Sequence, residues 1–187
     1  MRSNKGQEYW DCTTESARRF YLTFPRGRLP KISLGNILDL GCSSGVTTQE
    51  IADIYQDSQI IGIDVNHRRL RIASGLNSNA NIHFLLADGY QMPFSDLAFD
   101  AVFCMNNLNQ VIGCEMISRK KLVEIANEIA RVIKPRGYLM FSGQDRSIMQ
   151  KSDSGFDIIY YSYDSSPQPS VTLLEALNNR FQGARKW

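Results

Sequence analysis

The stretch Ile-Leu-Asp-Leu-Gly-Cys-Ser-Ser-Gly at residues 37–45 decides how this chain folds. Residues 36–40 are a short apolar run that is typical of a buried strand, and residues 46–55 have the pattern of a helix. The glycines at 41 and 45 mark the turn between them, where the backbone can approach a ligand closely and the helix start offers free N–H groups to an anion. Such a turn can also serve tight packing alone, so it predicts a strand–loop–helix unit and a candidate site.

The same alternation of strands and helices continues along the chain. Alternating strands and helices build right-handed βαβ units and a parallel sheet covered on both faces. The sequence therefore predicts an α/β fold, a Rossmann-like doubly wound and mostly parallel sheet, in a single domain of 187 residues. The predicted strands are residues 36–40, 59–64, 82–87, 99–105, 138–142 and 156–163, and the predicted helices are residues 8–24, 46–55, 67–76, 120–133 and 171–181.

Composition and charge exclude several classes of protein. With 43% apolar and 21% charged residues, the chain has ordinary globular composition, unlike a disordered or fibrous protein. No apolar run is long enough to span a bilayer, so no membrane partner is expected. The net charge of +2 demands no nucleic-acid partner. Basic residues gather before residue 36 and after residue 165, where they form either solvated termini or a weak anion-attracting rim.

The cysteines and histidines predict no metal site. The cysteines include no Cys-x-x-Cys pair, and neither His67 nor His83 stands near a cysteine at ligand spacing. Scattered cysteines are typical of a reducing compartment, and the polar start of the chain has no secretory signal, so we expect a cytoplasmic protein. The cysteines are Cys12, Cys42, Cys104 and Cys114.

Two acids follow the second and third predicted strands. Asp64 stands 19 residues after Gly45, where a carboxylate can accept the ribose hydroxyls of a nucleoside; it could equally cap the following helix. Asp88 could accept from an exocyclic amine such as N6 of adenine, or only stabilise a turn. Because the carboxyl ends of parallel strands meet at one edge of the sheet, the two acids and the glycine loop together favour a nucleoside-containing ligand.

These residues together give the chain a family resemblance. It resembles the class I S-adenosylmethionine (SAM)-dependent methyltransferases, in the small-molecule branch that includes the ubiquinone and menaquinone methyltransferases. The resemblance implies SAM as cofactor, S-adenosylhomocysteine as product, and transfer of a methyl group by in-line displacement to a small-molecule acceptor. The stretches that match, in the family's order, are ILDLGCSSG (37–45), IIGIDVN (60–66), LLADGYQMPFSDLAFDAVFC (85–104) and IARVIKPRGYLMFS (129–142).

The resemblance also implies roles for particular residues. Asp64 would bind the ribose hydroxyls, and the backbone near Asn106 would contact the SAM amino group. Tyr9 would close over the cofactor, unless it is a core residue of the first helix. The residues expected against the methionine part of SAM are Asp39, Gly41, Cys42, Ser43 and Gly45, and those expected against adenine are Val65, Asp88 and Gly89.

The chain departs from the family pattern in its loop and at its C-terminal end. Ser43 stands where the family usually has a second glycine. The family's sheet usually has two more strands after Gly143, the last of them antiparallel, but only residues 156–163 show an obvious strand pattern. The last strand is therefore either missing, which would reduce the C-terminal part of the sheet, or supplied by residues 181–187.

The resemblance divides the single domain into three parts. Residues 1–35 would form an N-terminal helical cap, residues 36–143 the SAM-binding core, and residues 144–187 a C-terminal segment on the substrate side. The cap is short and no substrate-binding insertion is evident, so the site is expected to be open. A homodimer or a partner protein could complete it.

No residue is assigned as a catalytic base. An in-line displacement needs a base only if the nucleophile must lose its proton early. His67 and His83 are poorly placed for that role, and the Asn/Asp-Pro-Pro-Tyr motif of amino methylation is absent. The asparagines that stand in its place could orient a polar substrate or cap the loop; they are Asn106, Asn107 and Asn109.

Three other functions are weighed against small-molecule methylation. The acceptor could be a protein or RNA, held by the open site and the basic ends. The chain could instead be a SAM-binding regulatory or structural partner with little activity. A nicotinamide-dependent dehydrogenase is disfavoured, because Ser43 and Val46 interrupt the G-x-G-x-x-G pattern that such an enzyme needs.

Overall fold

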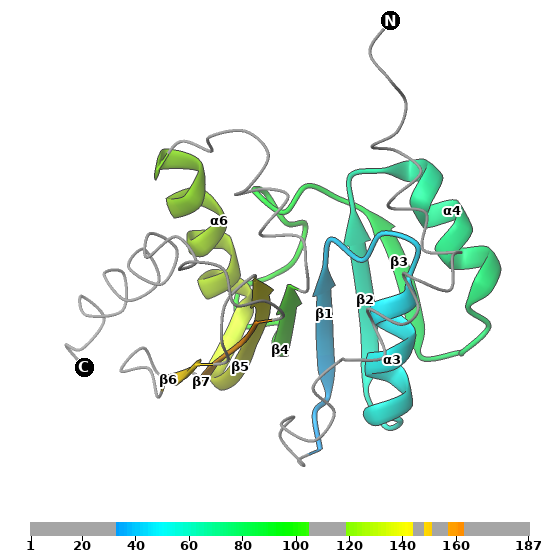
Figure 1. Ribbon diagram of the computed structural model, residues 1–187, viewed down its shortest axis with the longest axis horizontal. Helices are drawn as coiled ribbons and strands as arrows, with labels where there is room; N and C mark the ends of the chain where they lie inside the picture. Colours follow the sequence, from blue (N-terminus) through cyan, green and yellow to red (C-terminus); the bar gives the residue numbers. More distant parts are fainter. Residues whose placement is uncertain (1–32, 105–118, 144–147, 151–156, 163–187) are drawn as a thin grey trace, which may run out of the picture.

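The computed structural model describes residues 33–104, 119–143, 148–150 and 157–162, which form one sheet with helices on both faces (Figure 1). The strands are β1 (Asn36–Leu40), β2 (Gln59–Asp64), β3 (Ile82–Leu86), β4 (Phe99–Cys104), β5 (Ile133–Gly143), β6 (Ile148–Gln150) and β7 (Asp157–Ser162). The helices are α3 (Val46–Ile54), α4 (His67–Leu76) and α6 (Arg119–Val132). None of these described helices is long and apolar enough to cross a membrane.

The sheet confirms the predicted α/β architecture. The strand order is β3-β2-β1-β4-β5-β7-β6, and every neighbouring pair is parallel except β6 and β7. The chain passes outward from β1 through β2 to β3 and then returns to place β4 on the other side of β1. The strand order therefore reverses between β1 and β4, and open α/β sheets bind their ligands at the carboxyl ends of the strands beside such a reversal.

Two apolar layers hold the helices against the sheet. Strand residues alternate between the faces, so β1, β2, β4 and β5 contribute to both layers. The α3 layer joins Ile51, Ala52 and Tyr55 to Ile37, Ile60, Ala101, Phe103 and Met140 of the sheet. The α6 layer joins Ile125, Ala126, Ile129 and Val132 to Leu38, Leu40, Ile63, Val102 and Leu139. The apolar stripe that predicted the helix over residues 120–133 is thus the buried face of α6.

The carboxyl end of α6 differs slightly from the sequence-based prediction. The helix ends at Val132, and Ile133 already pairs with Phe99 as the first residue of β5, five residues before the predicted strand start. Pro135 and Gly137 do stop the helix, as expected, but the chain remains extended against β4. A register shift between Phe99 and Ala101 accommodates this segment, in which Arg136 takes a φ of 64°.

The C-terminal strands also differ in part from expectation. The predicted strand over residues 156–163 is β7, parallel to β5. An antiparallel strand is present as well, but it is β6, which precedes β7 along the chain and lies at the edge of the sheet. Its three residues are too few for periodicity to reveal. The predicted helices at 8–24 and 171–181, the alternative strand at 181–187, and Tyr9 and Asn106 lie outside the described residues.

Candidate cofactor site

The loop between β1 and α3 has a left-handed backbone at three of its residues. The φ values are 76° at Gly41, 52° at Ser43 and 80° at Gly45. Position 45 requires glycine, because a Cβ atom there would lie 2.8 Å from both Asn77 Nδ2 and the Phe84 ring. The loop is tied to β2 by the amides of Gly41 and Cys42, which donate to the Ile63 carbonyl at 2.8 and 2.9 Å.

Asp39 lies at the floor of this loop and is fully buried. Its Oδ2 accepts a hydrogen bond of 2.7 Å from Thr48 Oγ1 on α3, while its Oδ1 is buried with no partner. Burial raises the pKa of Asp39 to about 7; the Thr48 hydrogen bond lowers it and the nearby Asp64 charge raises it further. A buried carboxylate oxygen without a donor is unusual in a folded protein and marks a place where a ligand donor would fit.

Cys42 contributes its backbone amide to the loop, and its sulfur lies 4.0 Å from the Ser43 carbonyl oxygen. The side chain is buried against β2, where a Cβ on Gly62 would lie 2.9 Å from the Cys42 sulfur. Burial, and then the charges of Asp39 and Asp64, raise the pKa of the Cys42 thiol far above its usual range. The thiol therefore stays protonated and is a poor nucleophile.

Asp64, at the end of β2, joins two loops. Its Oδ2 accepts the Ser43 amide at 3.0 Å, and its Oδ1 accepts the Asn66 amide at 2.7 Å. The interpretation of Asp64 as the cap of α4 is wrong, because the cap is Asn66, whose Oδ1 accepts the amides of Arg68 and Arg69. The asparagine directly before the helix is the sequence signal for this cap. The side chain of Val65, between the two, is 70% exposed.

Asp88 and Gly89 follow β3 and form a tight turn. Asp88 Oδ1 accepts the Tyr90 amide at 2.9 Å, so the turn-stabilising role weighed from the sequence is real. Gly89 lies against the end of β1, since a Cβ there would lie 2.8 Å from Leu40 Cδ1. Leu86, 58% exposed, provides apolar surface just before this turn. The three strand ends thus meet at one edge, as the parallel sheet predicts.

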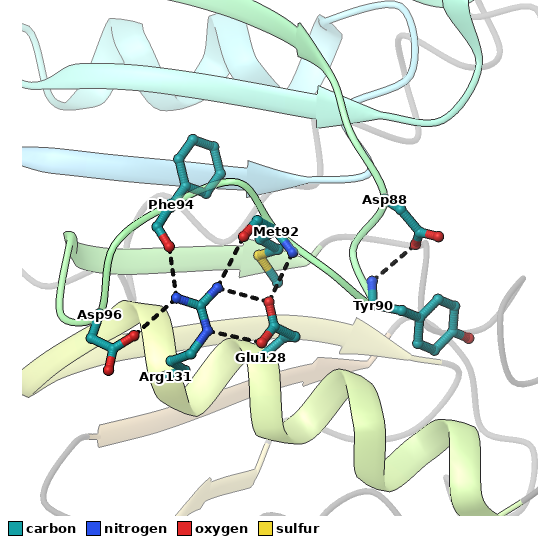
Figure 2. Close-up of polar contacts among 7 residues, drawn as sticks. All are labelled: Asp88, Tyr90, Met92, Phe94, Asp96, Glu128 and Arg131. Atoms are coloured by element: carbon teal, nitrogen blue, oxygen red, sulfur yellow. Dashed lines mark hydrogen bonds and ion pairs between the residues drawn. The ribbon is translucent and has the colours of Figure 1, made fainter.

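A cluster of polar contacts fixes the segment that follows Asp88 (Figure 2). Arg131 on α6 donates to both carboxylate oxygens of Glu128 at 2.8 Å. It also donates to the carbonyls of Met92 at 3.0 Å and Phe94 at 2.6 Å, and to Asp96 at 3.0 Å. Glu128 in turn accepts the Met92 amide at 2.8 Å. Sequence reasoning missed this cluster; only the Glu–Arg spacing of three residues on a predicted helix hinted at the ion pair.

Of the two histidines, His83 lies away from this edge, as expected, whereas His67 follows Asp64 by three residues. His67 is the first residue of α4 and is exposed. His83 lies near the start of β3, opposite Ile61 of β2, with its ring 3.3 Å from Gln59 Oε1. No group of three or more potential metal ligands occurs within the described residues.

Comparisons with known proteins give the class. A model of the methyltransferase domain family matches residues 37–137, more than half of the chain. The chain therefore belongs to the methyltransferase domain family, and the resemblance to class I SAM-dependent methyltransferases is confirmed.

Relatives of established function are methyltransferases. Malonyl-[acyl-carrier protein] O-methyltransferase of Legionella pneumophila is 35% identical over 120 residues, 64% of this chain and 39% of that protein. Demethylmenaquinone methyltransferase of Corynebacterium urealyticum is 28% identical over 153 residues, 82% of this chain and 59% of that protein. The chain spans less than two thirds of either length.

A solved structure shows the same fold. The N-methyltransferase NodS from Bradyrhizobium japonicum, in complex with S-adenosylhomocysteine, superposes with a TM-score of 0.57 at 20% identity, over 71% of this chain and 64% of that one. At this identity the likeness concerns the fold alone.

The site residues fit SAM. The unpartnered Oδ1 of Asp39 could accept from the ammonium group of a methionine moiety. The exposed Val65 and Leu86 offer apolar surface beside Asp64 and Asp88, where a flat heterocycle would be expected. The close packing of Gly89 on Leu40 brings the turn backbone to the same edge.

Proposed function

We propose that this protein is a SAM-dependent methyltransferase that methylates a small-molecule acceptor. The observation that carries the proposal is the convergence of three carboxylates, Asp39, Asp64 and Asp88, at the carboxyl ends of three adjacent strands around a left-handed loop. The named relatives support a small acceptor group over a polypeptide side chain or RNA, since one is a demethylmenaquinone methyltransferase and the other methylates the malonyl group of malonyl-[acyl-carrier protein].

Each carboxylate has a distinct environment that suits a distinct part of SAM. Asp39 is fully buried and its Oδ1 lacks a donor, so it suits a cationic ammonium group. Asp64 is half-buried between two loops and suits the ribose hydroxyls, which would add to its two amide donors. Asp88 lies in a turn beside apolar surface and suits adenine N6.

When bound, SAM supplies an electrophilic methyl group on a sulfonium. The contribution of this chain to such a transfer is to hold the cofactor rigidly, to bring the acceptor close and to exclude water. Within the described residues we assign no general base. An acceptor with an acidic proton, such as a carboxylic acid or an enol, would need none.

We propose that the acceptor lies over the carboxyl ends of β4 and β5, opposite the adenine side. Residues 36–143 would form the SAM-binding core, residues 1–35 the cap and residues 144–187 the substrate-side segment. A second copy or a partner protein would complete an open site. The proposed location is the cytoplasm, supported by the buried free thiol of Cys42.

Calorimetry and acceptor screening test this function. We expect heat on titration with SAM and with S-adenosylhomocysteine, and none with NAD. Methyl-labelled SAM is then incubated with carboxylic acids, hydroxyquinones and amines, and product is extracted and counted. Heat with NAD and none with SAM would overturn the proposal. SAM binding without transfer to any acceptor would favour the regulatory alternative.

A further inference from the structure

Ser43 adopts a backbone conformation that L residues rarely take. Its φ is 52°, in the left-handed region where glycine is at ease and a side chain is disfavoured. It lies in the middle of the loop between β1 and α3, flanked by the left-handed glycines 41 and 45. A serine can persist there only if contacts elsewhere hold it in place.

Two hydrogen bonds from the β2–α4 region hold Ser43. Its amide donates to Asp64 Oδ2 at 3.0 Å. Its hydroxyl oxygen accepts from Arg69 Nη1 at 2.6 Å. Arg69 lies in the first turn of α4, where its own amide is bonded to the Asn66 cap, so its side chain starts from a fixed point. The arginine reaches back across 26 residues of sequence to the loop.

We propose that Arg69 is a positioning residue for the cofactor loop. Its guanidinium holds the Ser43 hydroxyl and so stabilises the left-handed backbone that glycine would adopt without help. If the contact is lost, Ser43 relaxes toward negative φ, its amide turns away from Asp64, and the loop and the acid move apart. The expected loss of SAM binding rests on the proposed function. The expected effect on the loop backbone does not depend on any cofactor.

A double-mutant cycle separates this role from a general charge effect. Arg69→Met should weaken SAM binding about tenfold, since a charge-assisted hydrogen bond and the loop geometry are lost together. Ser43→Ala keeps the left-handed strain but loses the hydroxyl, so it should weaken binding similarly, and adding Arg69→Met to it should change little. Ser43→Gly removes the strain, so Arg69→Met in that background should change binding by less than about twofold. Arg71→Met, an exposed residue of the same helix, is the matched control for charge and should bind normally.

Two readouts keep the outcomes distinct. SAM affinity is measured by calorimetry, with KM for SAM and kcat compared once an acceptor is known; KM should rise and kcat should hold. Hydrogen exchange of residues 41–45 is measured without cofactor and should quicken in Arg69→Met but not in Arg69→Met with Ser43→Gly. An equal effect of Arg69→Met in the serine and glycine backgrounds, or unchanged exchange in Arg69→Met, would overturn the proposal. A wild-type chain that binds no SAM would overturn the proposed function, while the exchange experiment would still decide the role of Arg69.

Discussion

Arg131 and Glu128 form a two-pronged ion pair on one face of α6, with Nε and Nη2 of the arginine each 2.8 Å from a carboxylate oxygen. The pair also bonds to the main chain of Met92, where Arg131 donates to the carbonyl and Glu128 accepts from the amide. Through this contact a helix that follows β4 determines the path of the segment after β3, which begins with Asp88 and Gly89. The adenine side of the proposed site therefore depends on a helix that lies outside it.

Removing the arginine should loosen this segment. Arg131→Met removes the donor that the Met92 and Phe94 carbonyls share with the partly buried Glu128. The hydrogen bond from Arg131 is the largest cause that lowers the pKa of Glu128, so this pKa should rise in the variant. We expect a loss of about 2 kcal/mol in the free energy of unfolding and weaker SAM binding. Chemical denaturation and calorimetry measure the two effects. Lys120→Met breaks the exposed Lys120–Glu124 pair on the same helix and should cost less than about 0.5 kcal/mol. Equal losses in both variants would contradict the prediction.

The pH dependence of SAM binding should report on Asp39. Its pKa lies at about 7, and an ammonium group gains from this carboxylate only when it is ionised. SAM affinity should therefore rise as the pH passes upward through 7. Asp39→Asn should bind SAM weakly and with little pH dependence over the same range. Calorimetry between about pH 6 and pH 8 checks both, with Asp57→Asn, an exposed acid, as control.

Asp39 should affect stability in the opposite direction. The folded state holds the proton more tightly than the unfolded state, because the pKa rises from 3.8 to about 7 on folding. Between these values the folded state binds more protons, so the free energy of unfolding of the cofactor-free protein should fall as the pH rises. Asp39→Asn should flatten this slope. A wild-type slope of the opposite sign, unchanged in the variant, would show that other groups dominate.

Asp64 and Asn66 should separate cofactor binding from helix capping. Asp64→Ala should weaken SAM binding by more than about 1 kcal/mol without unfolding the chain, because it removes the acceptor of two loop amides and of the ribose hydroxyls. Asn66→Ala should instead cost about 1 kcal/mol of stability, since it removes the cap of α4. Melting curves and SAM titrations of both variants give the comparison. A loss of stability confined to Asp64→Ala would reverse these roles.

Two glycines offer a test of the loop geometry. Gly45→Ala places a Cβ 2.8 Å from Asn77 and Phe84 at a φ of 80°, so we expect a loss of about 2 kcal/mol or more in stability. Gly75→Ala, in α4, meets nothing within 4 Å and should stabilise the chain by about 0.5–1 kcal/mol. Thermal unfolding distinguishes the two. Similar melting temperatures for both variants would mean that the loop relaxes freely.

The N-terminal segment is expected to matter for transfer more than for the sheet. Among the described residues the first strand begins at Asn36, so deletion of residues 1–24 should abolish methyl transfer while sparing much of the fold. Circular dichroism checks the fold and labelled SAM checks the transfer. Full activity in the truncated protein would exclude this segment from the active site.

The order and position of the main elements follow from the sequence because they depend on local patterns. The apolar run at 36–40 and the apolar stripe of the helix over 120–133 each reflect the burial of one segment. The spacing of apolar residues within the segment is enough to predict that burial. The acids at 64 and 88 could be placed at one edge because parallel strands must align their carboxyl ends. The family could be identified for the same reason, since its motifs lie at successive strand ends.

Only the tertiary structure decided which polar groups meet. Arg131 bonds to Met92 across 39 residues of sequence, and Arg69 bonds to Ser43 across 26. Neither separation corresponds to a helix or strand period, so the sequence pattern does not predict these contacts. The Ser43 amide meets Asp64 across 21 residues, because β1 and β2 pack side by side and bring their following loops together. Strand β6 is too short to predict alone and forms because β7 offers it a partner. Each of these contacts is a hydrogen bond between segments that are distant in the sequence. It can form only after the packing of the sheet and helices has brought those segments together.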